Sequence, residues 1–162
     1  MTEKEMFLAS YEREFATTLK VLKAYPTAKG DFKPHERSMS AMQLAWAFVI
    51  EQQVGIAGAL AGAVDFSKVP PPPATLQEVI AAYEKGHRET VAKVKAASDA
   101  TLNQTIKFPV GPKQMGDLRT MDVIWGMLFD EIHHRGQLSV YLRMAGGKVP
   151  SIYGPSADEP WM

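Results

Sequence analysis

The sequence of 162 residues contains no cysteine. Disulfide bonds, thiolate metal ligands and a cysteine nucleophile are therefore excluded. The chain also has no excess of either charge, because 18 Lys and Arg residues balance 18 Asp and Glu residues. Nucleic-acid binding depends on clustered positive charge, so we expect no nucleic-acid partner.

Long hydrophobic runs are missing as well. The longest mostly apolar stretch, Leu44 to Ile50, is only seven residues long. A membrane-spanning helix needs about 20, so we expect no membrane partner. Near the N-terminus, Glu3 and Glu5 stand where a signal peptide needs a basic stretch followed by an apolar one. These features together predict a cytoplasmic protein.

Several catalytic motifs are absent from the sequence. It contains no G-x-S-x-G nucleophile elbow, no phosphate-binding G-x-x-x-x-G-K-[ST] loop and no G-x-G-x-x-G after a strand. Di-iron bundles carry two Glu-x-x-His motifs, and only Asp130-x-x-His133 comes close to one. A ferritin-like oxidase is therefore disfavoured.

What the sequence does contain is helical periodicity in four stretches, with no convincing strand alternation between them. The second and third stretches start at capping boxes, Ser40 to Gln43 and Thr75 to Glu78. The four predicted helices cover about residues 3–25, 41–60, 75–98 and 120–145. This pattern predicts an all-α protein, a four-helix bundle with long crossover connections, in a single domain over residues 1–162.

The segments between and after these helices carry distinct features. Pro70 to Pro73 predict a stiff connector before the third helix. Residues 99–119 are rich in Pro and Gly, so we expect a long crossover loop with at most a short turn of helix. Gly146 and Gly147 end the fourth helix, and the tail of residues 148–162 carries apolar residues that predict packing on the bundle.

The densest cluster of reactive side chains lies in the fourth helix. Asp130 and His134 are four residues apart, so both lie on one face and can reach one divalent ion. A third ligand must come from another helix. Glu51 is the eligible candidate, because it falls on an apolar stripe of the second helix that faces the bundle interior. Glu51, Asp130 and His134 are therefore the candidate metal ligands.

Each of these residues also has a purely structural interpretation. The four-residue spacing of Asp130 and His134 suits a hydrogen-bonded pair as well as it suits metal ligation. Glu51 could pair with Arg135 or a lysine. His87 lies on an apolar stripe and is best interpreted as a hydrogen-bonded core histidine. We expect His133 to serve packing and hydrogen bonding. The spacing alone leaves the choice between pairing and metal ligation open.

Two segments resemble the DinB/YfiT-like family, named after DNA-damage-inducible genes and unrelated to the DNA polymerase that shares the name. They are His133 to Arg143 and Gly147 to Asp158, and Leu44-Ala45-Trp46 is similar to the family as well. The resemblance implies a four-helix bundle, a homodimer and a bacterial cytoplasmic protein. It also implies that the segment Tyr153 to Asp158 folds over the last helix near the mouth of the site, as a structural cap.

Members of this family often bind one divalent ion, such as nickel or zinc, through three histidines. Carried over by position, one of these matches His134, the second is replaced by Asp130, and the third falls on Ala47. Compared with the family pattern, this sequence thus keeps one ligand, has a carboxylate in place of another and lacks the third. Glu51, one turn after Ala47, could substitute for the lost histidine. One His and two carboxylates suit zinc, nickel, iron or manganese.

Three hypotheses for function follow. The first is a metal-binding DinB-like protein that acts as a hydrolase on an unknown small molecule, with the ion lowering the pKa of a bound water. The second is a degenerate member that has lost the metal and acts as a binding or structural dimer. The third, a thiol-dependent transferase, depends only on the resemblance of the fold.

Overall fold

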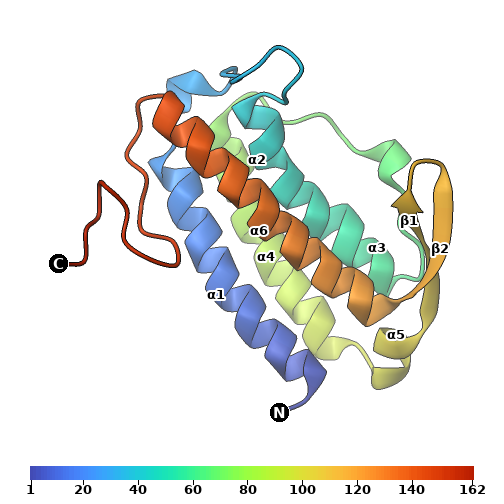
Figure 1. Ribbon diagram of the computed structural model, residues 1–162. Helices are drawn as coiled ribbons and strands as arrows, with labels where there is room; N and C mark the ends of the chain where they lie inside the picture. Colours follow the sequence, from blue (N-terminus) through green and yellow to red (C-terminus); the bar gives the residue numbers. More distant parts are fainter.

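Four long helical segments pack side by side in the computed structural model, which describes residues 1–162 (Figure 1). Three of them are the helices α1 (Glu3–Ala24), α4 (Leu76–Ala96) and α6 (Thr120–Met144). The remaining segment is continuous in direction but is made of α2 (Ala41–Ile50), the π-helix η2 (Glu51–Ile56) and α3 (Ala57–Leu60). The predicted all-α four-helix bundle is confirmed.

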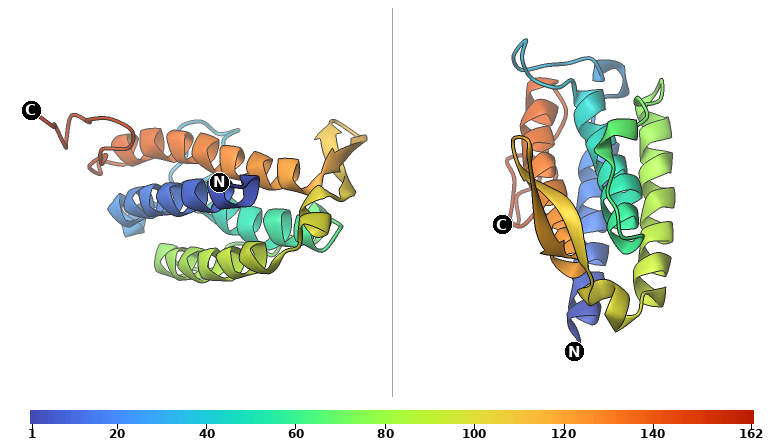
Figure 2. Two further views of the ribbon diagram at one scale, coloured as in Figure 1. Left: turned by 90° about the horizontal axis from the view of Figure 1, so that it is seen from below. Right: turned by 90° about the vertical axis from the view of Figure 1, so that its right-hand side faces the viewer.

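The four segments form a closed ring in which α2 and α6 are neighbours, and α1 and α4 complete the ring. In Figures 1 and 2, α1 and α6 run in one direction and α2 and α4 run in the other. The connection from α3 to α4 therefore returns along the length of the bundle. It includes the short 3-10 helix η3 (Phe66–Lys68) and the predicted proline connector. None of the helices combines the length and the apolar character needed to cross a bilayer.

Side-chain caps mark where the helices begin, and a backbone motif marks where α6 ends. Ser40 accepts a hydrogen bond from the Gln43 amide, and Thr75 accepts one from the Glu78 amide, which confirms both predicted capping boxes. At the other end of the chain, α6 stops in a Schellman motif, in which the Gly147 amide bonds to the Leu142 carbonyl. Gly146 adopts a φ of 84° there, a conformation that favours glycine.

The π-helix η2 changes which residues of the second helical segment are buried. Two consecutive residues, Glu51 and Gln52, both point into the bundle, and both are buried. Gly55 lets α6 approach closely, since a Cβ at this position would lie 2.3 Å from the Met127 sulfur. Single-turn π segments occur frequently at functional sites.

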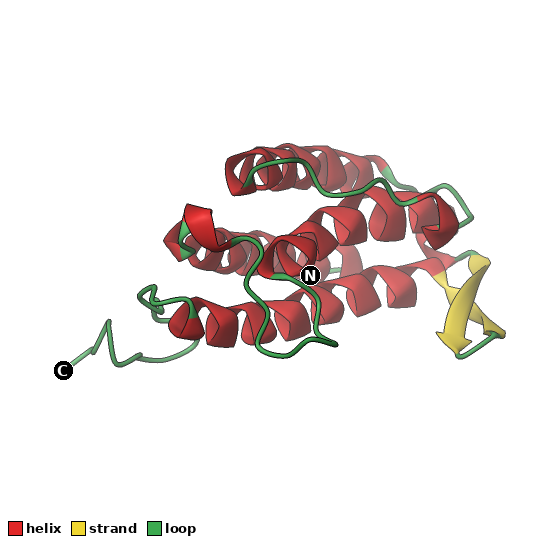
Figure 3. Cartoon of the chain, turned by 90° about the horizontal axis from the view of Figure 1, so that it is seen from above, coloured by secondary structure: helices red, strands yellow, loops and turns green.

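The prediction of a crossover loop over residues 99–119 was wrong. The short helix α5 (Asp99–Asn103) matches the expected turn, but it is followed by an antiparallel hairpin of β1 (Thr105–Gly111) and β2 (Gln114–Arg119). The hairpin lies at one end of the bundle and does not cross it (Figure 3). Ile106 is buried and Phe108 is half-buried, so their alternation was a usable strand signal that Pro109 obscured.

The C-terminal tail packs on the bundle as predicted, but not at the expected place. Arg143 pairs with Asp158, and Lys20 pairs with Glu159 at 2.7 Å. Tyr153 reaches the buried Glu14 of α1, to which its hydroxyl donates a 2.6 Å hydrogen bond. The tail thus follows α1 and α6, and it does not line the pocket that the candidate metal ligands border.

Two helical glycines give a matched test of this packing. A Cβ at Gly86 of α4 would lie 2.2 Å from the Gln52 side-chain oxygen, whereas a Cβ at Gly136 of α6 would meet nothing within 4 Å. We expect Gly86→Ala to lower the free energy of unfolding by about 1–3 kcal/mol. Gly136→Ala should raise it by up to about 1 kcal/mol, because alanine favours the helix. Chemical denaturation measures both, and equal effects of the two variants would contradict the observed packing.

Candidate metal centre

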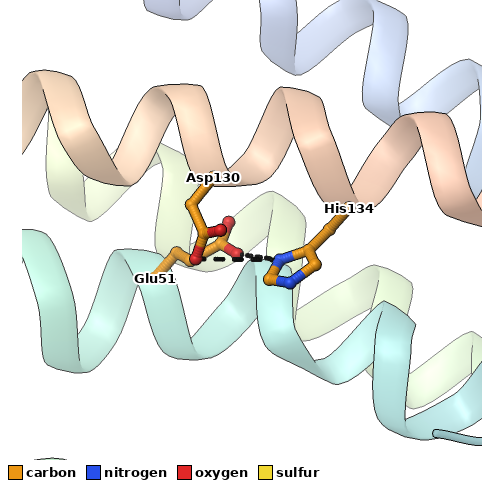
Figure 4. A group of neighbouring side chains, drawn as sticks. All are labelled: Glu51, Asp130 and His134. Carbon is orange, nitrogen blue, oxygen red and sulfur yellow. Dashed lines mark hydrogen bonds and ion pairs between the residues drawn. The ribbon is translucent and has the colours of Figure 1, made fainter. Parts of the chain in front are cut away.

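Glu51, Asp130 and His134 lie together between the second helical segment and α6 (Figure 4). One ligand atom from each residue can be chosen so that all three atoms lie within 4.8 Å of one another. His134 Nδ1 is 2.7 Å from Glu51 Oε1 and 3.9 Å from Asp130 Oδ2. The structure therefore brings all three predicted residues to one place.

Helix geometry explains why these side chains meet. Asp130 and His134 are separated by four residues of the regular helix α6, so their side chains lie on one face. Glu51 is the first residue of η2, and the contact between η2 and α6 turns it toward that face. Two helical segments thus supply the three groups without any contribution from a loop.

Burial makes Glu51 the unusual member of the group. Its side chain is only 4% exposed, against 45% for Asp130. Glu51 Oε2 is buried and has no hydrogen-bond partner. Burial raises the pKa of the Glu51 carboxyl well above its ordinary value, and the nearby carboxylates of Glu131 and Asp130 raise this pKa further. Burial also lowers the pKa of His134, which favours the neutral imidazole that can bind a metal.

A second charged network lies next to this group, on the α1 side of α6. Arg135 is 1% exposed and forms a 2.9 Å ion pair with Glu14. Its guanidinium also donates hydrogen bonds to Thr18 and Tyr153. Burial alone would raise the pKa of Glu14, but hydrogen bonds from Tyr153 and Arg135 outweigh it and lower the pKa. Arg135 is therefore a salt-bridge partner, and the predicted alternative of a Glu51–Arg135 pair is wrong.

Glu131 is the third buried carboxyl of the interior, and sequence reasoning missed it. Thr18 and Tyr83 donate hydrogen bonds of 2.8 Å and 2.6 Å to the same Glu131 oxygen. Burial raises the pKa of Glu131 despite these bonds. The four-residue spacing between Glu131 and Arg135 was the available signal, since it repeats the spacing of Asp130 and His134 one residue later.

Two further histidines were interpreted as structural, and the structure confirms the core role of His87 but not a packing role for His133. His87 is buried, stacks on Phe15 and forms a 2.9 Å hydrogen bond with Glu12, which confirms the interpretation as a core histidine. His133 is exposed and forms a hydrogen bond with Gln137 on the same helix. Neither residue lies with the metal-ligand candidates.

A pocket of about 300 Å³ opens beside Glu51, Asp130 and His134. Ala47 lines it, one turn before Glu51, so this position contributes a methyl group to the wall and no ligand atom. The connector closes one side through Phe66 and Val69. Trp46 Nε1 donates a 2.8 Å hydrogen bond to the Pro70 carbonyl, which holds the connector against α2.

These features define a class: a helical bundle with one crossover connection and a cluster of one histidine and two carboxylates between two of its helices. The DinB family model matches residues 1–161, and the chain belongs to this family. One curated relative that it matches is the uncharacterized protein YrdA of Bacillus subtilis strain 168. The two are 27% identical over 159 residues, which cover 94% of this chain and 89% of YrdA.

Solved structures show the same fold. A DinB-like protein of Bacillus subtilis, YjoA, superposes with a TM-score of 0.73 at 19% identity, over 91% of this chain and 97% of YjoA. A DinB-like protein of Bacillus cereus ATCC 10987 superposes with a TM-score of 0.76 at 22% identity, over 92% of this chain and 97% of that one. At these identities the structural similarity establishes the fold only. The chemistry of the site must be inferred from the residues of this chain.

The buried Arg135 network can be tested by breaking it. Arg135→Ala removes the buried cation from Glu14 and leaves only the exposed Arg13 beside this carboxylate, so we expect the free energy of unfolding to fall by about 3–5 kcal/mol. The control is Arg143→Ala, which removes an arginine whose pair with Asp158 is partly exposed and should cost at most about 1 kcal/mol. Urea denaturation monitored by circular dichroism measures both variants. Similar losses would show that the interior does not depend on Arg135.

Proposed function

We propose that the chain binds one divalent metal ion through Glu51, Asp130 and His134. The observation that carries this proposal is the state of Glu51, a buried carboxyl with one unpartnered oxygen beside a second carboxylate and an imidazole. Such a group is costly to ionise unless a cation neutralises it. Arg135, the buried guanidinium nearby, pairs with Glu14 and donates its hydrogen bonds away from Glu51.

The donor set suits several ions. One imidazole and two carboxylates are acceptable ligands for zinc, nickel, iron and manganese. Zinc and nickel, the ions implied by the family resemblance, are therefore the first to test. Three protein ligands would leave the ion able to bind a water or a substrate atom as well.

We further propose that the protein is a metal-dependent hydrolase of a small molecule. A bound divalent ion of this kind lowers the pKa of water and polarises a carbonyl oxygen. The chain itself supplies a mostly apolar pocket beside the three ligands, and burial lowers the pKa of His134, which favours the neutral imidazole that can act as a ligand. In this proposal Asp130, at the more exposed edge of the group, acts as a ligand or as a base.

The competing function is that of a degenerate member without metal, acting as a binding or structural protein. Two observations favour it: Ala47 brings no ligand to the pocket, and Glu51 already forms a 2.7 Å hydrogen bond with His134. In that case the three residues stabilise the interface between α6 and η2 and have no chemical task.

Elemental analysis of untagged protein, loaded with zinc or nickel and then desalted, separates these functions. We expect about one ion per chain in the wild type. His134→Ala and Asp130→Ala remove one ligand each and should lower the occupancy at least tenfold at limiting metal. His133→Ala is the matched control, because His133 is the exposed neighbour of His134, its Nε2 is hydrogen-bonded to Gln137, and it does not belong to the group of three candidate ligands. Wild-type protein without a stoichiometric ion would support the degenerate function.

Glu51→Gln provides an independent test through stability. Without metal, the amide removes the ionisable group that is unfavourably buried, so we expect the variant to unfold at the same temperature as the wild type or higher. Saturating zinc should raise the unfolding temperature of the wild type, since about 2.7 kcal/mol is gained at a hundredfold excess over Kd. The gain should be much smaller in Glu51→Gln. An equal gain in both proteins would exclude Glu51 as a ligand.

A further inference from the structure

Apart from the three candidate ligands, Gln43 is the one polar residue that lines the pocket. Its apolar lining consists of Trp46, Ala47, Ile50, Phe66, Val69 and Met127. No lysine and no arginine line it. An anionic ligand would therefore lose its hydration on entry without gaining a fixed positive charge from the protein.

The charge of the candidate ligands also disfavours an anionic ligand. Glu51 and Asp130 bring two negative charges as carboxylates, and a divalent ion cancels both, so the filled site is neutral overall. Three neutral imidazoles would instead leave the full charge of the ion to attract an anion. Opposite charges a few ångströms apart attract strongly when little water separates them, so this difference decides which ligands are favoured.

We propose that the pocket binds a small neutral molecule that has a carbonyl group next to a short apolar chain, as in an aliphatic amide or ester. The carbonyl oxygen would face Glu51, Asp130 and His134, and the chain would lie along the apolar wall. This proposal deepens the proposed function and depends on it, because the neutral charge requires the ion. Carboxylates, phosphates and thiolates are disfavoured by the same argument.

Ala47 is the residue that sets how long the apolar chain can be. It lies one turn before Glu51 on the same face of the helical segment, so it borders the pocket directly beside the candidate ligands. Its methyl group leaves a volume that any larger side chain would fill. Phe66 and Val69 limit the same volume from the connector, which the Trp46–Pro70 hydrogen bond holds in place.

The test uses three probes of similar shape on the zinc-loaded full chain: butanamide, hexanamide and hexanoate. Binding is followed by NMR through the indole N–H resonance of Trp46. We expect hexanamide to bind about fifteenfold more tightly than butanamide, because each of its two additional buried methylenes contributes about fourfold in affinity. Hexanamide should also bind at least as tightly as hexanoate, from which it differs mainly in charge.

Ala47→Leu should weaken hexanamide at least fivefold by filling the pocket. The control is Ala61→Leu, which adds the same side chain at the exposed end of the same helical segment and should leave the affinity unchanged. Circular dichroism checks that both variants fold. The comparisons among the three probes are made on the wild type and do not depend on the variants.

Zinc uptake is measured separately for each protein by competition with a chromophoric chelator. A wild type that takes up no zinc overturns both the proposed function and this inference. A wild type that binds zinc but prefers hexanoate tenfold, or gains nothing from the longer amide, overturns only the inference. An unchanged hexanamide affinity in folded Ala47→Leu also overturns it.

Discussion

The ion pair between Arg135 and Glu14 is the interaction on which the charged interior depends. Three carboxyls, of Glu14, Glu51 and Glu131, are buried among the helices, and the buried guanidinium of Arg135 faces two of them, Glu14 and Glu131. Such a buried ion pair stabilises the fold no more than apolar residues of similar volume would. Removing only one partner is nevertheless costly, because it leaves the other charge buried without full compensation. Arg135 therefore fixes α6 against α1, and its second hydrogen bond orders Thr18, which in turn holds Glu131.

One turn of α6 carries both this network and the candidate metal centre. Glu131 and Arg135 point toward α1 and α4, while Asp130 and His134, one position earlier, point toward the second helical segment. Consecutive residues of an α-helix differ by about 100° in direction, so two pairs with the same spacing face different neighbours. The rigid packing that Arg135 imposes on α6 thus also fixes the positions of Asp130 and His134 relative to Glu51.

Local rules made most of the helices and the candidate site predictable from sequence. Capping boxes and stripes of apolar residues marked the helices, and a spacing of four residues placed Asp130 beside His134. The π-helix at Glu51 and the Glu14–Arg135 pair depend on contacts between distant segments, for which one sequence holds no local signal. The hairpin was missed because Pro109 weakens a strand pattern. The expected homodimer and cytoplasmic location stay predictions.

Two carboxylates beside one histidine determine what the bundle can tolerate as well as what it can bind. Without an ion, burial raises the pKa of Glu51 and so favours the protonated carboxyl, and it lowers the pKa of His134, which accompanies Glu51 in a 2.7 Å hydrogen bond. With a divalent ion, the two carboxylates cancel its charge. The buried part of the site is close to neutral in both states, so the apolar walls around Ala47 need not accommodate a large change in charge. Three histidines could not provide this balance, because the charge of the ion would remain uncompensated inside the pocket.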